Sequence, residues 1–169
     1  IYKEIPVTCP LNRTSQKETG KPSIFHGDKL NISFKKTNAM HHPVLLHEYF
    51  DETVLKFPNK EALIFEDQRY TYSDIYTHAN WLCRSLMNLG MKPHDRVLIY
   101  MDNAPEVLIS LYGILKAGGI FVIINTSVQL QKLSYIIRDC EPSVIIDKNK
   151  KGEHIISALQ TNRMNIPVV

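Results

Sequence analysis

The sequence predicts an α/β protein, in which part of a doubly wound, mostly parallel sheet carries helices on both faces and is incomplete at its C-terminus. The main observation is the stretch 115–146, where a helix end, a strand, a second helix and a second strand follow one another closely. A second observation is that, from residue 97 onward, apolar runs alternate with segments of helical periodicity in the order β-α-β-α-β-α-β. Right-handed crossovers between such parallel strands give a doubly wound sheet.

Within 115–146, glycines end the first helix at Gly118 and Gly119, where a left-handed backbone is cheap. The run 120–124 is continuously apolar, which predicts a strand covered on both faces. Ser127 is the predicted N-cap of the next helix, and 143–146 is a second buried strand. The apolar face of that helix is formed by Leu130, Leu133, Ile136, Ile137 and Cys140.

The upstream segment predicts an amphipathic helix over 46–57, and then a hairpin of strands 62–65 and 69–72. Ser73 is expected to cap a long helix that Gly90 ends.

The next predicted elements are a buried strand over 97–101 and a helix capped by Asn103, with Pro105 in its first turn. A helix over 153–161 and a terminal strand over 166–169 complete the order. The residues expected to face the sheet from the helix after Asn103 are Val107, Leu108, Leu111, Tyr112 and Leu115.

Charge divides the 169-residue chain into two parts. Residues 1–43 carry seven Lys/Arg against three Asp/Glu, whereas the remainder carries thirteen against fourteen. We expect 1–42 to be a basic, disordered leader, because it has few periodic apolar positions, and 43–169 to form the folded domain. Without interleaved basic and aromatic residues, a nucleic-acid partner is not expected. No apolar run is long enough for a membrane span.

Cysteine and histidine do not form a recognisable site. Cys9, Cys83 and Cys140 are widely spaced, which predicts buried reduced thiols in a cytoplasmic protein. His41, His42 and His47 lack a neighbouring carboxylate or cysteine, so solvated or helix-edge histidines are favoured over metal ligands.

Five motifs, in this order, resemble the AMP-forming adenylating ligases, the superfamily of acyl-CoA synthetases, luciferases and peptide-synthetase adenylation domains. The resemblance runs from about Pro43 to Asp147, and more faintly to the end of the chain. One departure is that Ile123 and Thr126 stand where family members often carry prolines. The motifs are Phe57–Ile64, Tyr70–Ile75, Leu89–Val97, Asp102–Glu106, and Lys116–Gly119 with Asn125.

The resemblance implies the N-terminal part of the large domain of an ATP-dependent acid–thiol ligase. Such an enzyme uses ATP and Mg²⁺ to convert a small-molecule carboxylic acid into an acyl-adenylate. It then transfers the acyl group to coenzyme A or to the phosphopantetheine of a carrier protein.

The family's phosphate-binding loop, adenine and magnesium element, ribose aspartate and late lysine all belong to later sequence. The resemblance therefore assigns no catalytic, cofactor-binding or metal residue to this chain, and we expect the isolated chain to be inactive. The segment 14–22 superficially resembles a phosphate loop, but it lacks an inner glycine and follows no predicted strand.

Two alternatives remain open. Asp102 and Asp147 each follow a predicted strand, as in phospho-receiver domains, although Asn103 stands where a second acid is needed. A short non-catalytic or degenerate α/β binding protein is the other alternative, and its sheet edge at 168–169 would need covering.

Overall fold

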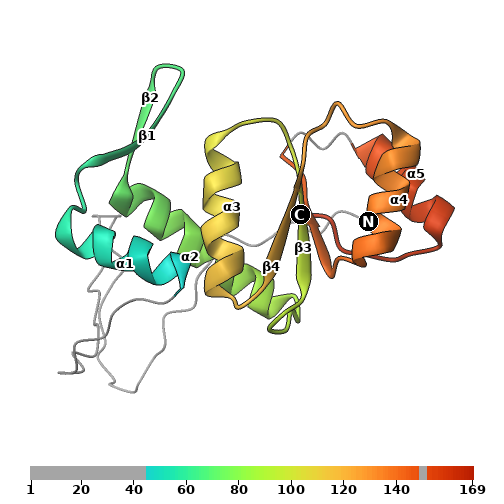
Figure 1. Cartoon of the computed structure of the whole chain (residues 1–169), viewed down its shortest axis with the longest axis horizontal. Coiled ribbons are helices and arrows are strands. Elements are labelled where there is room, and N and C mark those ends of the chain that lie inside the picture. The colour runs from blue at the N-terminus through green and yellow to red at the C-terminus, as the bar shows by residue number, and fades with distance from the viewer. Residues whose placement is uncertain (1–44, 149–151) are drawn as a thin grey trace, which may run out of the picture.

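The computed structural model describes residues 45–148 and 152–169, which form helices and strands in an α/β arrangement (Figure 1). This confirms the predicted fold class. The elements are α1 Leu46–Lys56, β1 Glu61–Phe65, β2 Gln68–Thr71, α2 Tyr72–Asn88, β3 Arg96–Tyr100, α3 Pro105–Lys116, β4 Ile120–Ile124, α4 Leu130–Cys140, β5 Val144–Ile146 and α5 Gly152–Asn162.

The central sheet is parallel and has the order β4-β3-β5. Val97 of β3 lies in register with Phe121 of β4 on one side and Val144 of β5 on the other. The predicted terminal strand is reduced to an isolated parallel bridge between Val168 and Ile145. β3, the earliest of these strands in the sequence, is therefore the middle one.

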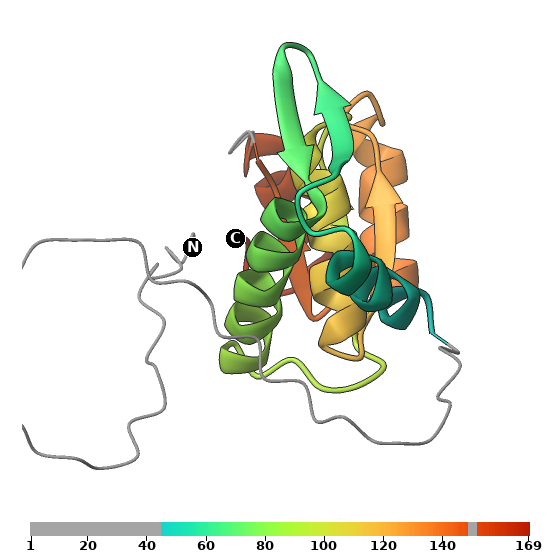
Figure 2. The ribbon, with the colours of Figure 1, turned by 90° about the vertical axis from the view of Figure 1, so that its left-hand side faces the viewer.

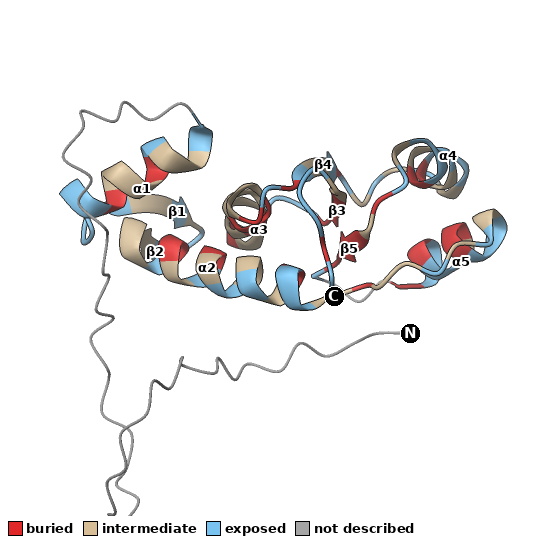
Figure 3. Cartoon of the chain, turned by 90° about the horizontal axis from the view of Figure 1, so that it is seen from below, coloured by how far each residue is buried: buried red, intermediate tan, exposed pale blue. Residues whose placement is uncertain are grey.

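Helices cover both faces of this sheet, as expected of a doubly wound fold (Figure 3). Because side chains alternate along a strand, Val97 and Ile99 of β3 face α2 and α3, while Leu98 and Tyr100 face α4 and α5. All four side chains are fully or almost fully buried. One core thus lies on each side of β3.

A third apolar cluster, the α1 cluster, packs α1 against α2 and α3, away from the sheet. Its buried members are Phe50, Val54, Ile75 and Tyr76. The rings of Phe50 and Tyr112 stack with their centroids 3.9 Å apart. Beside them, Lys116 Nζ lies 2.5 Å from Asp51 Oδ1 and 4.5 Å from the Tyr76 ring centroid. The β1–β2 hairpin projects from this end of the molecule (Figure 2).

Three predicted helix caps were wrong by one or two residues. The N-cap of α2 is Thr71 rather than Ser73, because Thr71 and Asp74 satisfy each other's backbone N–H groups. The N-cap of α3 is Ala104 rather than Asn103, and Gln129 rather than Ser127 precedes α4. The glycine stops were correct, since Gly90 and Gly118 have φ of 91° and 77°.

The prediction that 120–124 is covered on both faces was also wrong. Ile120 and Ile123 are 46% and 47% exposed, because β4 is an outer strand of the sheet. On α3 the sheet-facing set was partly wrong, since Leu108 and Tyr112 pack in the α1 cluster and the fully buried apolar side chain is Ile114.

The predicted leader, residues 1–42, lies outside the described residues. Among the helices that the structure describes, none is both long and apolar enough to cross a membrane.

Candidate functional site

The carboxyl edge of the parallel sheet is the place where this fold gathers polar side chains. In open α/β sheets the chain segments that leave neighbouring strands toward opposite faces bound a crevice at this edge. Here α3 leaves β3 toward one face, whereas α4 and α5 leave β4 and β5 toward the other. Asp102, Thr126 and Asp147 follow these three strands.

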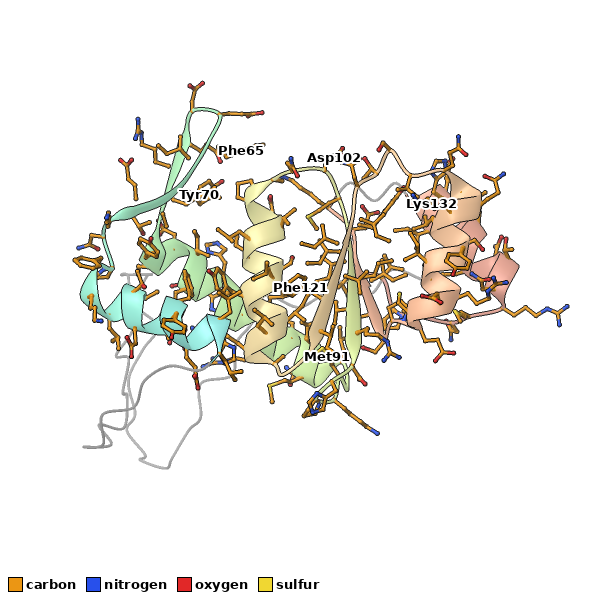
Figure 4. The ribbon with its side chains drawn as sticks, in the orientation of Figure 1. Phe65, Tyr70, Met91, Asp102, Phe121 and Lys132 are labelled. Atoms are coloured by element: carbon orange, nitrogen blue, oxygen red, sulfur yellow. The ribbon has the colours of Figure 1, made fainter. Side chains whose placement is uncertain are left out.

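Two hydrogen bonds connect the loops after β3 and β4. The hydroxyl of Tyr100 donates to the Thr126 carbonyl oxygen at 3.3 Å, and the Thr126 hydroxyl donates to Asp102 Oδ1. Asn125 Oδ1 accepts the Ser127 N–H at 2.8 Å and so shapes the start of the loop before α4. Figure 4 shows Asp102 at the end of the sheet where this loop lies.

The electrostatics of this edge keep Tyr100 protonated. Burial raises the pKa of its hydroxyl, and the carboxylates of Asp147 and Asp102 raise it further. Asp147 itself is only 6% exposed, and its N–H donates to the Val169 carbonyl oxygen at 2.8 Å. Tyr100 is therefore a hydrogen-bond donor at neutral pH rather than a base.

At the same edge, an ion pair connects the segment after β5 to the first turn of α3. Lys148, just after β5, donates to Glu106 Oε2 at 2.9 Å, although both side chains remain about half exposed. The sequence placed Glu106 at a helix N-terminus, where its charge suits the helix dipole, but did not reveal this partner. The contact between Lys148 and Glu106 could have been predicted, because both residues follow neighbouring parallel strands whose carboxyl ends lie at the same edge.

The part of the chain that the structure describes shows no recognisable metal site. Nowhere in 45–148 and 152–169 do three His, Cys, Asp or Glu residues group so that they could hold a metal ion. Asp102 and Asp147 do follow two neighbouring strands, β3 and β5, as the receiver alternative requires. His47 is on α1, away from the sheet, while His41, His42 and the segment 14–22 lie outside the described residues.

The structure describes two of the three cysteines for which buried reduced thiols were predicted. Cys83 and Cys140 are free and partly buried on α2 and α4. Burial raises the pKa of both thiols, and nearby Lys116 and Arg84 only partly offset this for Cys83. Neither is therefore an activated nucleophile.

Residues 50–169 match the family model described as AMP-binding enzyme. Tyrocidine synthase 3 from Brevibacillus parabrevis is 35% identical over 103 residues, which are 61% of this chain and 2% of that protein. Gramicidin S synthase 2 from Brevibacillus brevis is 28% identical over 148 residues, which are 87% of this chain and 3% of that protein. The chain thus spans a small fraction of these curated relatives.

Solved structures give the same result. The anthranilate CoA ligase AuaEII, in complex with anthranoyl-AMP, superimposes with a TM-score of 0.66 and 28% sequence identity. The match covers 73% of this chain and 24% of that one. These similarities support neither the receiver nor the binding-protein alternative. With most of its length matched by the family model, the chain belongs to the AMP-binding enzyme family.

Proposed function

We propose that residues 43–169 form the N-terminal part of the large domain of an ATP-dependent acid–thiol ligase. The observation that carries the proposal is the family match over 50–169 to a parallel α/β unit. The enzyme would join a carboxylic acid to the α-phosphate of ATP, releasing pyrophosphate. A thiol of coenzyme A or of a carrier protein's phosphopantetheine would then displace AMP and form a thioester.

In this proposal the described residues serve as scaffold and do not bind ATP. The N-terminal turn of α3, the helix that leaves the central strand, carries Glu106, with Asp102 just before it. Carboxylates at that position repel the phosphates that a helix N-terminus would otherwise attract. The free thiols of Cys83 and Cys140 are consistent with the cytoplasmic location that we propose.

The first test is the mass of the native gene product, detected with an antibody against residues 43–169. A product several-fold heavier than 19.5 kDa supports the ligase proposal. A product near 19.5 kDa rejects it in favour of the short binding protein.

The second test is ATP–pyrophosphate exchange by the purified 169-residue chain with a panel of carboxylic acids. We expect no exchange above a heat-denatured control, because the family resemblance places the groups that stabilise the reacting phosphate in later sequence. Acid-dependent exchange would show that the chain does carry a complete adenylation site.

A further inference from the structure

We draw no further inference here: the strongest candidate, the apolar surface patch at the start of α1 where Leu45, Leu46 and Tyr49 are each more than half exposed, carries none, because nothing in the part of the chain that the structure describes shows what covers it.

Discussion

Gly113 lies where α2 and α3 cross, and its missing side chain sets how closely these helices approach. A Cβ at this position would stand 3.0 Å from the Ala79 carbonyl oxygen and 3.0 Å from two atoms of Leu82. The backbone carbonyl cannot rotate away, so we expect Gly113→Ala to lower the free energy of unfolding by about 1–3 kcal/mol in urea titrations.

Gly90 provides the control for that prediction. A Cβ there would meet no atom within 4 Å, and only the positive φ of 91° opposes it. Gly90→Ala should therefore cost about 1 kcal/mol through backbone strain alone. If Gly113→Ala proves no more destabilising than Gly90→Ala, the close helix approach is not what requires glycine at 113.

The two described cysteines should react slowly with thiol reagents. Their raised pKa values lower the thiolate fraction near neutral pH, and burial restricts access. With Cys9 replaced by serine, the folded chain should react with a chromogenic disulfide at pH 8 at least about tenfold more slowly than in urea. Equal rates in the two conditions would contradict this expectation.

At the scale of elements, the start of α2 gives a pH-dependent prediction. The side chain and backbone N–H of Thr71 bond to the Asp74 carboxylate at 2.7 and 2.9 Å and hold its pKa below the ordinary value. Because the pKa of Asp74 is lower in the folded state, its ionised carboxylate stabilises the fold at pH values above the unfolded-state pKa. This contribution is lost as the pH falls through the folded-state pKa. Asp74→Asn should thus be less stable at pH 7, by up to about 1 kcal/mol.

The stability gap between Asp74→Asn and the unchanged chain should close as the pH falls below about 4. Urea titrations at several pH values measure it. Because Asp74 is exposed, the gap is modest at best. A gap that stays constant down to low pH would show that the amide, rather than the lost charge, causes the difference.

The sequence predicted where the helices and strands lie along the chain better than it predicted which of them lie side by side. The alternation of apolar runs and helical periods was enough to locate β3, β4, α4 and β5. It could not reveal that β4 is outermost, because 120–124 reads the same whether one or two strands flank it. Cap positions failed for a local reason, since Thr71 and Ser73 are both good capping residues and only the pairing with Asp74 decides between them.

The carboxyl edge shows the same limit. Strand ends correctly placed Asp102 and Asp147 on one edge, because the carboxyl ends of parallel strands meet there. The bonds from Tyr100 to Thr126 and from Thr126 to Asp102 depend on side-chain directions in two loops, which periodicity does not encode. Likewise, Arg96 donates to the Cys140 carbonyl oxygen at the end of α4, a contact between residues far apart in sequence.

At the scale of the whole molecule, the domain boundary remains a prediction. If 43–169 is the folding unit, a chain truncated to these residues should keep the thermal midpoint of the full chain within about 2 °C, since a leader with few periodic apolar positions is expected to add little to stability. Calorimetry of both chains measures this. A clearly lower midpoint for the truncated chain would show that residues 1–42 contribute to the fold.

The middle position of β3 has a consequence for protein synthesis. The ribosome releases this strand before either of its neighbours, because β4 and β5 both come later in the sequence. Until β5 has emerged, Val97–Tyr100 can bond on one side at most, and the core on the α4 and α5 side still lacks α5. A nascent chain at that stage exposes an apolar strand to other molecules. Slow translation just after β3 would therefore favour aggregation or chaperone binding over folding.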